Sequence, residues 1–78
     1  MFTAEAQAIV DRTLASFPEQ TRKIFVMSRY ENKPHKEIAD ELGITTKGVE
    51  FHISKVLRAL RVNLRDYLSA FLYFFYLN

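Results

Sequence analysis

The sequence predicts an all-α protein of four helices in a single domain. Glycine and proline occur only twice each in 78 residues, and they fall between stretches whose apolar residues recur at helical spacing. No stretch makes a plausible strand, so neither a sheet nor a β-wing is expected. A chain of this length forms one domain at most. Because it has no cysteine, disulfides and thiolate metal sites are excluded as sources of stability.

The first helix is expected to begin after Thr3, a good N-cap residue, and to run to about Ser16. Its candidates for the core are Ala8, Ile9 and Leu14. Phe17-Pro18 then breaks the pattern, since proline restricts the residue before it. The second helix begins at Pro18 or Glu19, where proline suits a first helical position. It carries the apolar residues Ile24, Phe25, Met27 and Tyr30.

Residues 31–34 close the second helix and open the third. Asn32 tolerates the left-handed conformation that often ends a helix, and Pro34 keeps Lys33 out of the helical region. The third helix spans about His35 to Leu42, and Gly43 is placed to stop it.

The fourth helix begins at Thr45 or Thr46, either of which can act as its N-cap. No proline or glycine follows Gly48, so we expect one long helix of roughly 30 residues and 45 Å that runs into an apolar tail. The expected division of the chain is a helical domain over residues 1–66 and a helical extension over residues 67–78.

The third and fourth helices satisfy the requirements of a helix-turn-helix. Steeply crossed helices need a small residue at their contact, a turn residue free to take positive φ, and an apolar residue facing back from the second helix. Ala39, Gly43 and Val49 supply these in order. We also expect the two helices to approach closely at Gly43.

The fourth helix has an apolar face and a basic face. At 100° per residue, the apolar face holds Val49, Ile53, Val56, Leu57 and Leu60. The opposite face holds Lys47, Phe51, Ser54, Lys55 and Arg58. Residues 47–65 contain five basic residues and one acidic residue, whereas the whole chain carries a net charge of only +2. A basic stretch of this kind favours a polyanion as the partner, although a solvated helix face gives the same count.

These patterns predict DNA binding, with a role for each exposed residue of the fourth helix. Thr45, Thr46 and Lys47 are expected at phosphates or base edges, where a helix N-terminus favours anions. Glu50, Phe51 and Ser54 are candidates for contacts with bases. Lys55 and Arg58 are expected to bind flanking phosphates. The alternatives are burial of Phe51 against another helix, and for Glu50 a solvated charge or an intrahelical pair with Lys47 or Ser54.

No enzyme, cofactor or metal site is expected. His35 and His52 are 17 residues apart and lack a ligand set around them, so no metal site is expected there, and His52 is expected to flank the core face of the fourth helix. The acidic residues Glu37, Asp40 and Glu41 share one short helix and favour solubility over acid–base catalysis. No signal segment is visible and the apolar tail is too short to span a bilayer, so a cytoplasmic protein is expected.

A long stretch of the chain, PEQTRKIFVMSRYENKPHKEIADELGITTKGVEFHISKVLRALR, resembles region 4 of bacterial sigma factors of the extracytoplasmic-function (ECF) group. The likeness covers residues 17 to about 66. It rests on Phe17-Pro18-Glu19 with Arg22 and Phe25, on Glu37-Ile38-Ala39, on Leu42-Gly43-Ile44, and on Val49 through Ile53. Pro34 and Gly48 depart from the pattern, since the family usually has a serine cap and a threonine-like residue there.

The resemblance implies a DNA-binding subunit of RNA polymerase that reads the promoter −35 element. It also implies contact with the polymerase core at the β-subunit flap, and an anti-sigma factor is a further candidate partner. Two alternatives remain at this stage: the DNA-binding domain of a response regulator, and a protein-interaction module acting through its apolar tail. Under each of these interpretations, so short a chain is expected to be a module or a fragment of a longer protein.

The tail, residues 67–77, is apolar at ten of eleven positions and contains six of the eleven aromatic residues. A helix that is apolar on every side must be buried. We expect self-association of two tails to bury it, through Tyr67, Phe71, Phe74 and Phe75. The alternatives are folding of the first three helices over the tail and docking on a partner protein or an upstream domain.

Overall fold

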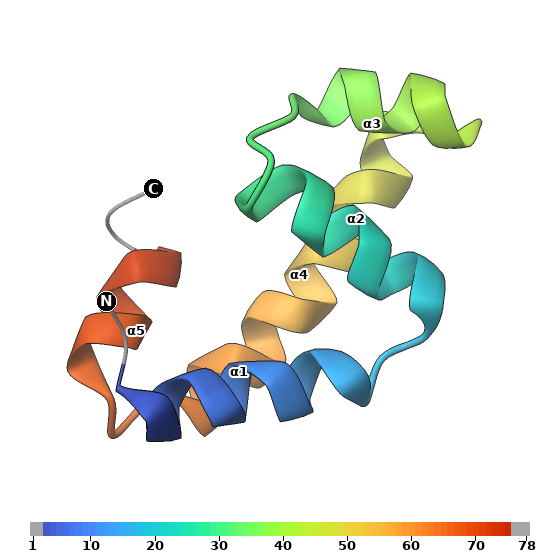
Figure 1. Cartoon of the computed structure of the whole chain (residues 1–78). Helices are drawn as coiled ribbons and strands as arrows, with labels where there is room; N and C mark the ends of the chain where they lie inside the picture. The colour runs from blue at the N-terminus through green and yellow to red at the C-terminus, as the bar shows by residue number, and fades with distance from the viewer. Residues whose placement is uncertain (1–2, 76–78) are drawn as a thin grey trace.

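The computed structural model describes residues 3–75, and all regular structure in this range is helical (Figure 1). Five helices follow one another within these residues: α1 (Ala4–Ala15), α2 (Glu19–Arg29), α3 (His35–Leu42), α4 (Thr46–Asn63) and α5 (Leu68–Phe75). The predicted all-α class is confirmed.

The first three helices and the start of the fourth lie where the local chemistry predicted. The Thr3 hydroxyl accepts the Ala6 N–H at 3.0 Å and caps α1. Asn32 and Gly43 both adopt positive φ, at 55° and 69°, and separate α2 from α3 and α3 from α4. Thr45, rather than Thr46, caps α4 by accepting the Gly48 N–H at 2.9 Å. Pro34 precedes α3 without a side-chain cap, as its missing hydroxyl requires.

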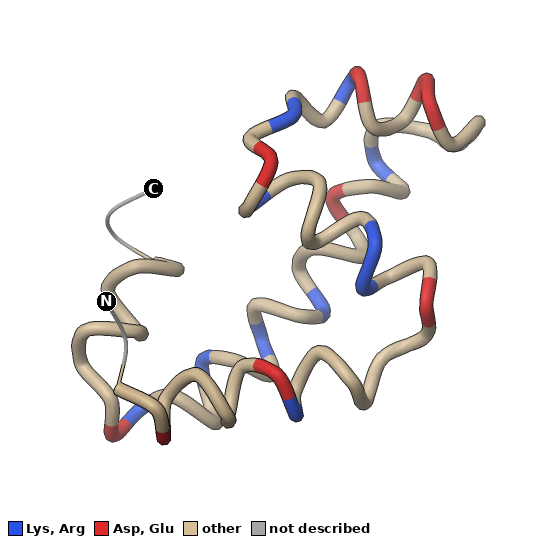
Figure 2. Tube along the Cα trace, in the orientation of Figure 1, with Lys and Arg blue, Asp and Glu red and all other residues tan. Residues whose placement is uncertain are grey.

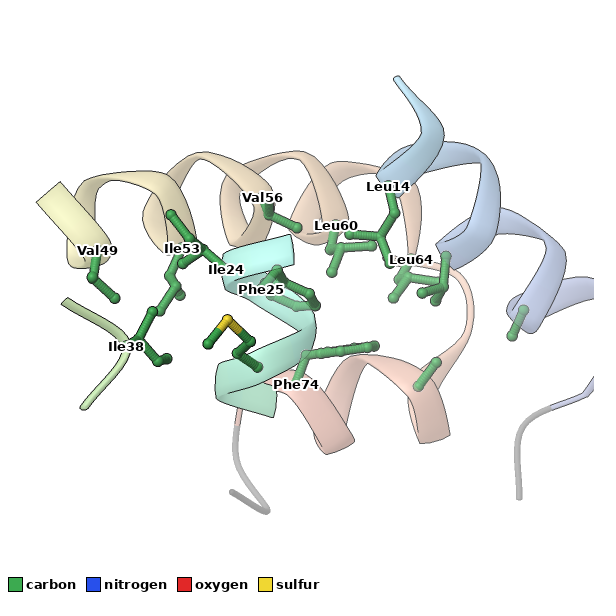
Figure 3. Close-up of a cluster of buried hydrophobic side chains, with 14 of the residues drawn as sticks. Leu14, Ile24, Phe25, Ile38, Val49, Ile53, Val56, Leu60, Leu64 and Phe74 are labelled. Carbon is green, nitrogen blue, oxygen red and sulfur yellow. The ribbon is translucent and has the colours of Figure 1, made fainter. Parts of the chain in front are cut away.

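Helix α4 forms the axis of the core, and the other helices pack around it (Figure 3). Its buried residues are Val49, Ile53, Val56 and Leu60, which lie on the predicted apolar face. In α1 the buried apolar side chains are Ala6, Val10 and Leu14, whereas Ala8 and Ile9 are only partly buried. The spacing of four residues keeps these three on one stripe of the helix.

The prediction of one continuous C-terminal helix is wrong. Helix α4 ends at Asn63, residues 64–67 form a turn, and α5 folds back along the core beside α2 and α4 (Figures 1 and 3). Leu64 is fully buried at the turn, and its N–H donates to the Leu60 carbonyl at 2.8 Å. The Asn63 side chain donates to the Thr13 hydroxyl at 2.9 Å, which ties the end of α4 to α1.

The physical reason for the reversal is burial of the apolar tail within the same chain. Phe74 is 2% exposed, and its ring centroid lies 5.8 Å from that of Phe25 in α2. Ala70, one turn earlier, is also buried. The Arg29 guanidinium donates to the Phe74 carbonyl at 3.3 Å and so binds the end of α5 to α2. A straight helix would have left this apolar surface in water. The free-energy cost of that exposure is about 25 cal/mol for each Å² of apolar surface.

Helices long and apolar enough to cross a membrane are not found within residues 3–75.

Candidate nucleic-acid interface

The turn between α3 and α4 has the backbone that a helix-turn-helix requires. Gly43 takes the left-handed conformation, and its N–H and that of Ile44 both donate to the Ala39 carbonyl. Ala39 and Val49 are buried on the two sides of the turn, at 3% and 0% exposure. The close helix approach expected at Gly43 is wrong, because a Cβ placed there would meet no atom within 4 Å. The positive φ alone explains why glycine is favoured at position 43.

The close approach in this unit occurs at Gly48 instead. A Cβ on Gly48 would lie 3.2 Å from the Thr45 hydroxyl oxygen, the atom that caps α4. Glycine is a weak helix former, but here it leaves the capping oxygen undisturbed. The N-terminal turn of α4 is therefore closed by Thr45 and Gly48 together.

The first turn of α4 presents donors to solvent. Thr46 and Lys47 are exposed, and their backbone N–H groups have no acceptor among residues 3–75. Two such donors at the positive end of an 18-residue helix favour an anion. Of the three residues predicted at this end, Thr45 has its hydroxyl occupied as the cap, while Thr46 and Lys47 face outward.

Phe51 is 60% exposed, so its burial against another helix is excluded. The ring is covered on one side by the Lys55 ammonium group, whose nitrogen lies 4.8 Å from the ring centroid. This cation–π contact holds the two side chains together and leaves the rest of the ring in water. Ser54 and Arg58 are exposed on the same face, whereas Lys55 is partly buried.

Glu50 does not pair with Lys47 or Ser54. Its carboxylate instead lies 3.8 Å from Nδ1 of His35, the first residue of α3, and both side chains remain about half exposed. His35 also lies 3.5 Å from the Ser28 hydroxyl through Nε2. An exposed pair of this kind contributes little stability, so the Glu50 carboxylate can exchange this partner for a base. Sequence spacing gave no signal of the contact, because it joins two helices.

His52 fixes the rotation of α4 against α2. Its Nδ1 lies 2.8 Å from the hydroxyl of Thr21, which is 1% exposed. The bond connects residues 31 apart in the sequence. Because His52 follows Phe51 directly, a fixed His52 also fixes the direction in which Phe51 leaves the helix. Thr21 was missed at the sequence level, where nothing distinguishes it from a surface threonine.

Charge is divided between the two helices of the unit (Figure 2). Helix α4 contains four basic residues and one acidic residue, while α3 contains Lys36 against three acidic residues. Lys33, in the loop before α3, pairs with Glu41 at 3.1 Å. That hydrogen bond is the main cause of a raised pKa at Lys33. The acids of α3 are thus partly neutralised by neighbouring lysines, whereas Lys47, Arg58 and Arg61 of α4 are exposed to solvent.

The four tail residues predicted to mediate self-association differ in how deeply they are buried. Phe74 is inside the core, so its assignment to a self-association surface is wrong. Tyr67, Phe71 and Phe75 are partly buried, and the rings of Phe71 and Phe75 lie 4.7 Å apart. Residues 76–78 of the predicted extension lie outside the described part of the chain.

The comparison with protein families gives a match for residues 7–60 to the family described as Sigma-70, region 4. The matched range contains α3 and α4 up to residue 60, which leaves out only the last residues of α4, and it ends before α5. Comparisons with curated proteins and with solved structures give no match.

Proposed function

The chain belongs to the sigma-70 region 4 family, which binds promoter DNA in transcription initiation, and we propose that it reads the −35 element as the C-terminal domain of an ECF-type sigma factor. The observation that carries the proposal is the exposed face of α4. On that face the candidate base contacts lie between cations, on a helix held in place by its opposite, buried face.

The spacing along α4 fits a helix lying across a major groove. Lys47 and Arg58 are eleven residues apart, which corresponds to about 16 Å of helix at 1.5 Å per residue. A major groove is about 12 Å wide. Glu50, Phe51 and Ser54 fall between the two cations along the same face. The cations therefore reach the phosphate edges while the three residues between them face the bases.

Each of the three central side chains matches a base edge. The Glu50 carboxylate accepts from the amino group of cytosine, the Phe51 ring packs on a thymine methyl, and the Ser54 hydroxyl donates or accepts. Thr46 and Lys47 bind a phosphate through their backbone N–H groups and the lysine charge. Lys55, held over Phe51, contributes charge beside the reading face.

Membership of this family also supports protein partners in addition to DNA. A sigma factor domain acts on RNA polymerase, so we propose contact with the polymerase core through the β-subunit flap, with regulation by an anti-sigma factor. With promoter DNA and polymerase as partners, the location we propose for the protein is the cytoplasm.

The proposal is tested by selecting duplexes from a library with a randomised central segment and measuring their affinity across a salt series. A shared motif is expected among the selected duplexes. The Glu50→Gln variant should change the preferred base at one position, with a loss of about 1–3 kcal/mol on the original motif. Arg58→Ala should weaken binding to every duplex and lower the salt slope by about one unit.

Arg12→Ala serves as the matched control, since Arg12 is an exposed arginine on α1, beside Asn63 and away from the reading face. It should leave both affinity and salt slope unchanged. Selection that yields no motif, or an Arg12 variant as weak as the Arg58 variant, would refute sequence reading through this face of α4.

A further inference from the structure

A groove between α4 and the end of α5 extends the basic face of α4 beyond Arg58. It has a volume of about 330 Å³ and is lined by Ser54, Leu57, Arg58, Arg61 and Phe75. Ser54 and Arg58 belong to the proposed DNA face, while Phe75 comes from a helix outside the range that matches the family. The groove is thus shared between the reading helix and the added helix.

Among the described residues, 3–75, the two arginines of the groove have no anionic partner. Arg58 and Arg61 are exposed, and neither forms an ion pair with any residue in the range 3–75. They are three residues apart on one helix, where like charges are neighbours and repel each other. An anion between the two guanidinium groups removes this repulsion and accepts hydrogen bonds from both.

The other lining residues define the shape of the groove. Leu57 and Phe75 supply apolar walls, and the Ser54 hydroxyl adds a third polar group. The position of Phe75 follows from its neighbour: Phe74 is anchored on Phe25, and Arg29 binds the Phe74 carbonyl. With Phe74 turned into the core, the next residue of the helix points about 100° away from it, toward α4.

We propose that this groove binds one backbone phosphate of the DNA, held jointly by Arg58 and Arg61, and that α5 thereby extends the DNA interface of the domain. The inference rests on the proposed function and adds Arg61 and Phe75 to the residues that serve it. Arg58 and Arg61 lie about 16 and 21 Å along the helix from Lys47, so the phosphate that they share lies at the far edge of the major groove.

The shared phosphate gives a specific signature in a salt series. Arg58→Gln and Arg61→Gln should each lower the salt slope by about 0.9 and the affinity by about tenfold, equally on selected and unrelated duplexes. The double variant should also lose only about 0.9 in slope, because a single phosphate is released. If each arginine held its own phosphate, the salt slope of the double variant would fall by about 1.8. That result would overturn the proposal that the two arginines share one phosphate.

Arg65→Gln is the matched control, because Arg65 is an exposed arginine in the turn after α4 and does not line the groove. It should leave the slope unchanged. Phe75→Ala should reduce the affinity a few-fold at an unchanged slope, and Phe75→Leu should restore it. Circular dichroism of each variant shows whether the helices remain folded.

The outcomes separate this inference from the proposed function. If the wild type selects a motif and Arg61→Gln binds like the wild type, the groove is not a DNA contact while the reading face stands. If the wild type binds no duplex, both proposals fail. Titration with inorganic phosphate, followed by NMR shifts of the arginine side chains, distinguishes a site for the free anion: saturation by phosphate without any change in duplex affinity would overturn the DNA assignment.

Discussion

Replacing Phe74 by alanine tests the most consequential feature of the fold, the docking of α5 on the core. Its side chain is 2% exposed and its ring lies 5.8 Å from that of Phe25, so the substitution removes a full aromatic contact. Core Phe→Ala changes cost about 3–5 kcal/mol. The expected loss is at the low end, about 3 kcal/mol, because a short terminal helix can undock instead of leaving a cavity.

A loss of this size is measurable in so small a protein. At 0.05–0.15 kcal/mol per residue, a 78-residue domain has a total stability of roughly 4–12 kcal/mol. A destabilisation of 3 kcal/mol therefore corresponds to a fall in Tm of about 12–24 °C. Urea and thermal unfolding followed by circular dichroism give both quantities.

Leu68→Ala is the matched control, since Leu68 lies on the same helix and is 70% exposed. Its expected effect is within about 0.5 kcal/mol. If the two variants unfold at the same urea concentration, α5 is not docked on Phe25. The continuous helix expected from the sequence would then be the better description.

Three further predictions concern the turn, the cap and the pH dependence of stability. Gly43→Ala should lower the free energy of unfolding, measured in urea, by about 1–2 kcal/mol, because the new side chain meets no atom and only the positive φ is strained. Gly43→Asn should lower it by less. Thr45→Ala should lose about 1 kcal/mol through the missing cap on the Gly48 N–H, measured in the same way. Tyr30 is 44% exposed, and the partial burial of its side chain raises the pKa of the hydroxyl, so the unfolded chain ionises first as pH rises. Stability should therefore fall above the ordinary tyrosine pKa of about 10, and Tyr30→Phe should reduce that fall in urea titrations at high pH.

The sequence predicted both ends of the first three helices and the start of α4 well because their signals are local. A threonine hydroxyl that caps its own helix, as at Thr3 and Thr45, acts within three residues. The positive φ of Asn32 and Gly43 depends on the backbone preference of a single residue. The apolar face of α4 was equally visible, since helical periodicity alone places Val49 and Ile53 on one side.

The end of α4 could not be predicted in the same way. No proline or glycine follows Gly48, and the helix stops at Asn63 because Leu64 and the tail find apolar partners in α1 and α2. The position at which α4 ends depends on contacts between residues far apart in the sequence, such as Phe25 and Phe74. The partners of Glu50 and His52 were missed for the same reason, because His35 and Thr21 lie on other helices.

The reversal after Asn63 changes how stability and DNA reading are connected. In a straight helix the tail would have been independent of the reading face, and its removal would have left α4 intact. In the observed fold α5 packs on the core that holds α4, and Phe75 lies beside Arg58. A substitution at Phe74 should therefore weaken DNA binding indirectly, by releasing Phe75, as well as lowering stability. By contrast, Arg61 lies on the exposed side of α4, so its replacement should affect the DNA contact while leaving the unfolding free energy nearly unchanged.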